Sequence, residues 1–389
     1  MVLLSGFQSG CGGTLCASGA TGMLLLIVRI MDNKALGAAR ASASRTGKQM
    51  MDAREAQLRR WLPAAIAQAA PELGPLPASE PTLSAASADA SARRYFRWQQ
   101  GDLSLIVMDA PPEHEDSEPF VRIAGLLAEA GVRVPKIYAK DLEQGFLLLE
   151  DMGPRTYLEQ IQAGVSSEKL DQMFAEAIDS LVCWQQSSRP GELPAYNDAV
   201  LLRELNLFPQ WYVERHLERS FTSDDQADWA ELCSLLLKSI NAEARVFVHR
   251  DYMARNLMVA DQGPPAVLDF QDALYGPASY DATCLFADAF FSWPEAQRTQ
   301  WMQRYWQAAR TGGIDLPAEF KDFQGQYRLM GVQRHLKVIG IFARICYQGG
   351  KPHYLDDVPR FFAYLHTACA DDVRLAPLQR LLARLELAA

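Results

Sequence analysis

The chain has 389 residues, more than one hydrophobic core usually serves, so two lobes or a domain with an extension are expected. Its 38 Lys and Arg stand against 47 Asp and Glu, a net charge of −9 that argues against a general nucleic-acid binder. Seven scattered cysteines form no zinc-binding spacing and favour reduced thiols in a cytoplasmic protein. No apolar run approaches the ~20 residues of a membrane span.

Residues 1–50 differ in composition from the rest of the chain. They hold five Lys and Arg against one acidic residue and are rich in Gly, Ala and Ser. A signal peptide is one interpretation, but the first 22 residues contain no Lys or Arg for its positively charged region. We favour a disordered extension or an early start codon, because Met50 and Met51 directly precede a helical pattern.

The pattern from residue 52 to 151 predicts a small sheet with one crossing helix. A first helix over 52–70 is expected to end at Pro71, before a segment rich in Pro and Ser. The turn at 99–102 lies between two strand patterns and indicates a hairpin. The expected strands cover 94–98, 103–109, 134–139 and 146–149, with a helix over 120–130.

Helical periodicity dominates after Gly153. Only three short strands are expected, over 246–248, 257–259 and 266–268. The predicted helices cover 168–187, 200–218, 225–243, 279–291, 295–310, 322–347 and 358–370. A β-rich lobe over 51–151 followed by a mainly helical lobe over 152–389 is the layout of a bilobal, protein-kinase-like α+β fold.

The stretch from His249 to Asp269 carries the clearest chemical signal. Transfer of a phosphoryl group from MgATP needs an acceptor for the hydroxyl proton and oxygen ligands for the metal. Asp251 is the expected base, and a short hairpin would return Asp269 beside Asn256 so that both hold Mg²⁺. His249 is expected to orient the loop through a backbone hydrogen bond. The competing interpretation is that these residues only cap turns and end a strand.

Several segments resemble the aminoglycoside phosphotransferase and choline kinase superfamily, namely 249–256, 268–273 and 276–281. The resemblance is closer to bacterial N-acetylmuramate/N-acetylglucosamine anomeric kinases, through 93–97, 107–113, 144–149, 206–209 and 337–344. It implies ATP- and Mg²⁺-dependent phosphorylation of the C1 hydroxyl of an amino sugar in peptidoglycan recycling. The product would then pass to a nucleotidyltransferase.

The N-terminal lobe departs from the broader superfamily at the nucleotide site. Met108 takes the position of the usual strand lysine, and Phe120 or a neighbour that of its glutamate partner. Positive charge for the phosphates is expected instead from the segment around Ser91, Arg93 and Arg94, although solvated strand-edge charges remain an alternative. Two residues at the lobe junction, Glu150 and Met152, correspond to the hinge whose backbone pairs with adenine.

The sugar pocket is expected in the helical lobe. Asn206 and Trp211 lie in a Pro-interrupted segment suited to binding and stacking on a pyranose ring. Arg334, with two other basic residues of the same helix, Lys337 and Arg344, would serve an acidic substituent, unless they form a solvated face.

Gln271 and Asp272 follow the expected metal ligand Asp269 by two and three residues. They either touch the substrate or stabilise the loop. Asp281 is expected to cap a helix and brace the catalytic loop. Two alternatives stay open: a kinase for another small-molecule hydroxyl, such as an aminoglycoside, choline or homoserine, and a nucleotide-binding pseudokinase suggested by Met108.

Overall fold

A computed structural model describes residues 53–87, 93–260 and 262–387 of the chain. The chain divides into two compact units, 1–64 and 65–389. A helix covers residues 53–73 and therefore runs past Pro71, where we expected it to end. The predicted extension over 1–50 and the predicted phosphate contact Ser91 lie outside the described residues.

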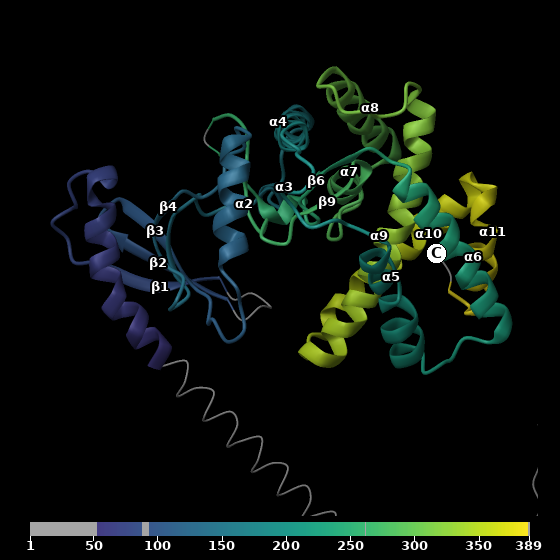
Figure 1. Cartoon of the computed structure of the whole chain (residues 1–389), viewed down its shortest axis with the longest axis horizontal. Helices are drawn as coiled ribbons and strands as arrows, with labels where there is room; N and C mark the ends of the chain where they lie inside the picture. The colour runs from purple at the N-terminus through teal and green to yellow at the C-terminus, as the bar shows by residue number, and fades with distance from the viewer. Residues whose placement is uncertain (1–52, 88–92, 261, 388–389) are drawn as a thin grey trace, which may run out of the picture. The chain divides into compact units, whose positions relative to one another are not determined.

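A five-stranded antiparallel sheet forms the first part of the larger unit, in the order β1-β2-β3-β5-β4 (Figure 1). Helix α2, Glu118–Glu129, lies beside it, with its apolar side buried. The strands are β1 Thr82–Ser87, β2 Arg94–Gln100, β3 Leu103–Asp109, β4 Ile137–Asp141 and β5 Phe146–Glu150. Strand β1 was not predicted, because its small residues lie in the stretch that we interpreted as a loop.

The sheet register fixes which side chains share a face. Arg97 on β2 pairs with Ile106 on β3, which in turn pairs with Leu149 on β5. Because side chains alternate along a strand, Arg97 and Ile106 project from the same face. Arg94 is three positions from Arg97 and projects from the opposite face, where its guanidinium lies 5.5 Å from the centre of the Phe96 ring.

The rest of the larger unit is mainly helical. Helix α9 is 30 residues long, and a Cβ atom on its Gly340 would lie 2.3 Å from the backbone carbon of Leu207, so only glycine allows this approach. The α-helices are α3 Tyr157–Gln162, α4 Ser167–Gln186, α5 Asp198–Leu205, α6 Ser223–Asn241, α7 Ser279–Phe286, α8 Glu295–Thr311, α9 Phe320–Gly349, α10 Val358–Asp371 and α11 Ala376–Arg384. Among the described residues, no helix is long and apolar enough to cross a membrane.

Two predicted helices differ from the structure. The single helix expected over 200–218 is α5 followed by a π-helix, η1, over Phe208–His216, with Pro209 at the start of the second piece. Proline lacks an N–H and cannot continue the first helix, so the change of helix type occurs there. Helix α7 ends at Phe286 rather than at residue 291.

Two small strand pairs carry the loops of the candidate site. Strand β6, Arg245–Val248, pairs with β9, Leu274–Pro277, which was not predicted. The second pair is β7 Leu257–Met258 with β8 Ala266–Val267. The loop after β6 and the loop after β8 leave different strand pairs and meet where His249 lies 2.9 Å from the carbonyl oxygen of Leu268.

Candidate active site

Hydrogen bonds from backbone N–H groups hold the loop after β6 in place. The carboxylate of Asp281 accepts hydrogen bonds from the backbone N–H of His249 at 2.7 Å and of Arg250 at 2.9 Å. Arg250 has a φ of 77°, a left-handed conformation that is costly for a residue with a Cβ. Asp281 lies in the first turn of α7, whose N-cap is Ala278, so it braces this loop but is not the cap that we predicted.

The imidazole of His249 joins the two sequence motifs. Its Nδ1 accepts the backbone N–H of Asp251 at 3.2 Å, and its Nε2 lies 2.9 Å from the carbonyl oxygen of Leu268. An acceptor at Nδ1 places the ring proton on Nε2, which then donates to Leu268. His249 thus fixes the backbone positions of Asp251 and of the strand end before Asp269.

Asn256 and Asp269 lie next to each other and to the base. The Asn256 amide nitrogen donates to the carbonyl of Asp251 at 2.9 Å and approaches the Asp269 carboxylate at 3.5 Å. The other Asp269 oxygen accepts from Gln271 at 2.8 Å. Asp269 has a φ of 62°, the second left-handed non-glycine residue of the site. Three sequence-predicted residues, Asp251, Asn256 and Asp269, are therefore brought together.

This donor set fits Mg²⁺. The Asn256 amide uses its N–H groups within the loop, which leaves its carbonyl oxygen for a cation beside the Asp269 carboxylate. Mg²⁺ is usually held by one or two protein oxygens together with water and substrate phosphates. No group of three or more His, Cys, Asp or Glu side chains that would suit a metal occurs among the described residues.

A second buried carboxylate, Asp288, holds the middle of the catalytic loop. It accepts the backbone N–H of Ala254 at 3.1 Å and of Phe290 at 2.7 Å. Its burial raises the pKa of its carboxyl group. Asp288 lies 34 residues from Ala254, and no local sequence pattern announces the contact.

Arg334 lies in the core behind the same loop. It is 2% exposed, and it donates to Cys284 Sγ at 2.9 Å and to the carbonyl of Ala287 at 3.1 Å. Cys284 in turn donates to the carbonyl of Arg250 at 3.2 Å. Arg334 is therefore not available for the predicted substrate contact, because its buried guanidinium joins α9 to α7.

Glu204 on α5 forms a buried ionic centre with two cations. Its Oε1 lies 2.5 Å from Arg250 and 3.1 Å from Lys337. Burial alone would raise the pKa of Glu204, but Lys337 and Arg250 outweigh it and lower this pKa to about 2. Lys337 also donates to the Tyr280 hydroxyl at 2.8 Å. The ammonium group that we predicted to bind substrate therefore has its partners within the core.

A cavity of about 410 Å³ opens beside Asn256 and Asp269. Its apolar walls include Ile106 and Leu149 of the sheet and Met258 of β7. Such walls suit a flat purine, and the two metal-ligand candidates mark where its phosphates would end. The predicted hinge residues, Glu150 and Met152, line the same space. Three further lining residues were not predicted: Arg97, Asp151 and Arg255.

The cations near this cavity are paired. Arg97 donates to Asp151 at 2.7 and 3.2 Å. Arg93 lies 3.1 Å from Glu115, and Arg94 lies 2.5 Å from the fully buried Asp109. Arg94 faces away from the cavity, whereas Arg97 lines it and was missed, since a lone arginine in a strand gives no signal.

Met108 and Phe120, which we expected near the lysine and glutamate positions of the broader superfamily, are both buried apolar residues. Met108 is 0% and Phe120 is 4% exposed, and both belong to one core cluster. The Phe120 ring lies 4.7 Å from that of Phe270, the residue after Asp269. This aromatic contact joins α2 to the loop that carries Asp269. The lysine–glutamate ion pair of the broader superfamily is missing from the sequence.

The remaining predicted substrate residues fall into two groups. Gln271 contacts Asp269, and the carbonyl of Asp272 accepts from Arg250 at 3.3 Å, so both lie at the catalytic loop. Asn206 is the C-cap of α5, and Trp211 lies half-buried in η1. No hydrogen bond links these two residues to Asp251 within the described part of the chain.

Known proteins are similar to this chain in sequence and in fold. A model of the phosphotransferase enzyme family matches residues 82–321. This chain belongs to that family. An N-acetylmuramate/N-acetylglucosamine kinase of Pseudomonas aeruginosa is 55% identical over 340 residues, covering 86% of this chain and 97% of its own. A protein of the same name from Neisseria meningitidis is 43% identical, covering 78% of this chain and 90% of its own.

Solved structures of the family share the fold. Choline kinase LicA from Streptococcus pneumoniae matches with a TM-score of 0.53 at 13% identity, over 74% of this chain and 93% of its own. A putative aminoglycoside phosphotransferase from Ralstonia eutropha matches with a TM-score of 0.52 at 16% identity, over 74% and 91%. The predicted kinase-like fold and phosphotransferase class are confirmed, and the enzyme is a kinase that acts on a hydroxyl group.

Proposed function

We propose that this kinase transfers the γ-phosphate of ATP to the anomeric hydroxyl of N-acetylmuramate or N-acetylglucosamine. The observation that carries the proposal is the 55% identity, over 97% of its length, to a relative that bears the name of this activity. The enzyme would act in the cytoplasm during cell-wall recycling, and its sugar 1-phosphate product is a suitable substrate for a nucleotidyltransferase.

Asp251 is the proposed catalytic base. His249 accepts the backbone N–H of Asp251 and Asn256 donates to its carbonyl, which holds Asp251 beside two residues that line the cavity, Asn256 and Asp269. A carboxylate there accepts the proton of the attacking hydroxyl and aligns that oxygen with the phosphorus atom. The anomeric hydroxyl is the most acidic of a sugar ring, which favours the transfer of its proton to Asp251.

Asn256 and Asp269 are the proposed holders of Mg²⁺, which supplies positive charge to the phosphates when bound. Arg93 and Arg94 remain proposed phosphate contacts, and Arg93 is the better placed because Arg94 faces the other side of the sheet. Glu150 and Met152 remain the proposed hinge at the cavity. Asn206, Trp211, Gln271 and Asp272 remain predicted sugar-pocket residues, whereas Arg334 belongs to the core.

An ADP-release assay with both amino sugars, followed by ³¹P NMR of the product, tests the proposal. We expect a phosphorus resonance coupled to the anomeric proton and loss of reducing-end reactivity. Phosphate on O6 would retain the kinase but remove the anomeric assignment. Turnover of choline or an aminoglycoside, with neither sugar accepted, would favour a kinase for another hydroxyl, and no turnover at all would favour the pseudokinase.

A further inference from the structure

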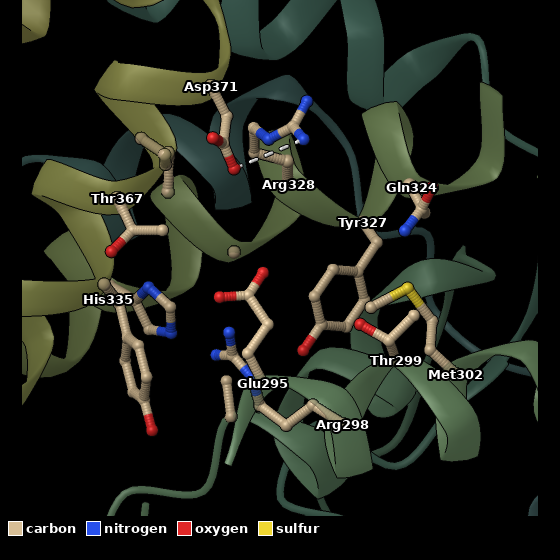
Figure 2. A pocket seen from close by; sticks show the side chains of 15 residues that line it. Glu295, Arg298, Thr299, Met302, Gln324, Tyr327, Arg328, His335, Thr367 and Asp371 are labelled. Carbon is tan, nitrogen blue, oxygen red and sulfur yellow. Dashed lines mark ion pairs between the residues drawn. The ribbon is translucent and has the colours of Figure 1, made fainter. Parts of the chain in front are cut away.

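A second cavity, of about 100 Å³, lies between helices α8, α9 and α10 (Figure 2). None of its lining residues lines the nucleotide cavity. Ala287 forms part of its wall, and the Ala287 carbonyl accepts a hydrogen bond from Arg334. No step of the proposed reaction uses it.

Two polar atoms in this cavity lack partners. The hydroxyl of Tyr327 and Nε2 of His335 are buried, and neither has a hydrogen bond in the structure. His335 is only 6% exposed, and Figure 2 shows its ring and the Tyr327 hydroxyl directed into the cavity. A buried polar group without a partner is destabilising, so two such groups facing one space indicate a polar occupant.

Two opposite charges also face this space. Glu295 and Arg298, one turn apart at the start of α8, both line the cavity. Within the described ranges neither forms an ion pair, whereas Arg328 at the rim is 3.6 Å from Asp371. Arg298 covers the Tyr364 ring at 5.3 Å, which fixes the guanidinium beside the cavity. The cavity therefore offers one unpaired cation and one unpaired anion.

His335 contributes no charge of its own. Burial, and then the neighbouring Arg334 and Arg298, lower the pKa of its imidazole well below the ordinary value. A neutral imidazole has one donor and one acceptor nitrogen, so Nε2 offers the cavity either a donor or an acceptor, according to the tautomer. The balance of charge at the site is thus set by Glu295 and Arg298.

We propose that this cavity binds a compact zwitterion of the α-amino acid class. Arg298 and the Tyr327 hydroxyl would bind the carboxylate, and Glu295 would bind the ammonium group. A guanidinium matches the planar carboxylate, and a small side chain would contact Met302 and Val332. An amino acid with one or two side-chain carbons is the largest ligand that suits the volume.

Calorimetry on the full chain with D-alanine and L-alanine tests this proposal. We expect saturable binding of at least one enantiomer, at least tenfold tighter than that of propionate or ethylammonium, each of which lacks one of the two charges. Absence of saturable binding by both enantiomers would overturn the site, because a cavity that holds only water gives no such response. Propionate binding as tightly as alanine would overturn the zwitterion class.

Two variants separate binding from folding. Tyr327→Phe removes only the unpartnered hydroxyl, so the melting temperature should stay equal or rise while alanine binding weakens at least fivefold. Arg298→Gln should weaken binding at least tenfold. The matched control is Arg304→Gln on the same helix, whose arginine faces Asp179 and not the cavity. Equal alanine binding by all three variants would contradict the proposal.

Discussion

Two left-handed residues mark the catalytic loop and the metal-binding loop at the scale of single residues. Arg250 and Asp269 each adopt a conformation that costs of the order of 1 kcal/mol or more outside glycine. Side-chain and backbone contacts on each side hold them there, including Asp281 for the first and Asn256 for the second. Arg250 directly precedes Asp251, so the two left-handed positions lie at the two predicted functional carboxylates.

Replacing the base tests the role of one carboxylate. Asp251→Asn keeps the size of the side chain but removes its ability to accept a proton, so kcat should fall by at least a thousandfold. Melting temperature and nucleotide affinity should remain near wild type. Asp102→Asn, at an exposed turn of the sheet, is the matched control. Turnover of the Asp251 variant within tenfold of wild type would reject the assignment.

At the scale of elements, α7 sets the conformation of the catalytic loop through Asp281. Burial raises the pKa of Asp281 to about 6, against an ordinary value of 3.8. The folded protein therefore keeps a proton that the unfolded chain has lost. The stability that this group contributes is fully present below pH 3.8 and is lost as the pH rises through about 6.

Asp281→Asn should remove this pH dependence. Between pH 5 and pH 7 the free energy of unfolding of the wild type should fall by about 1 kcal/mol relative to the variant, which cannot ionise at this position. Urea denaturation at a series of pH values measures the difference. Parallel pH profiles for the two proteins would show that Asp281 ionises normally. The variant should also lose activity at pH 7, because one loop N–H loses its acceptor.

Helix α9 depends on the buried charge of Glu204. Glu204→Gln leaves Arg250 and Lys337 without their carboxylate, so the free energy of unfolding should fall by about 3–5 kcal/mol. Adding Lys337→Met should recover part of this loss, because one buried cation is then removed. Glu214→Gln, on an exposed position of η1, is the control for chemical denaturation. A loss below 1 kcal/mol at Glu204 would mean that solvent already screens the centre.

The sequence predicted the elements whose patterns are local. The catalytic spacing from His249 to Asp269 and the hairpin of β2 and β3 depend on residues close in the chain, and both were found. Strand β1 was missed because its small residues, directly after Pro81, show no strand period. The π-helix at Pro209 was read as one helix, because hydrophobic spacing does not distinguish helix types over nine residues.

Contacts between distant segments could not be predicted. Arg334 and Lys337 had the spacing of a charged helix face, but their partners on α5 and α7 place them in the core. Asp288 gave no signal, since its hydrogen-bond donor lies 34 residues earlier. Such residues are assigned by packing, which a single sequence does not reveal.

At the scale of the whole molecule, the segment before Met51 is expected to be dispensable. Its composition lacks the apolar periodicity of a core-forming segment, and the helical pattern begins only after it. A chain that begins at Met51 should match the full chain in melting temperature and kcat. A fall of more than 5 °C, or loss of half the activity, would show that residues 1–50 contribute to the folded protein.

The bracing of the catalytic loop from behind also sets an order of events during synthesis. Residues 249–256 leave the ribosome before Asp281 and Asp288, which their backbone needs as acceptors. Arg334, which joins α9 to this layer, emerges about 80 residues after the base at Asp251. We therefore expect a nascent chain that already carries Asp251, Asn256 and Asp269 to be inactive, and phosphoryl transfer to begin only after α9 has been made and has docked.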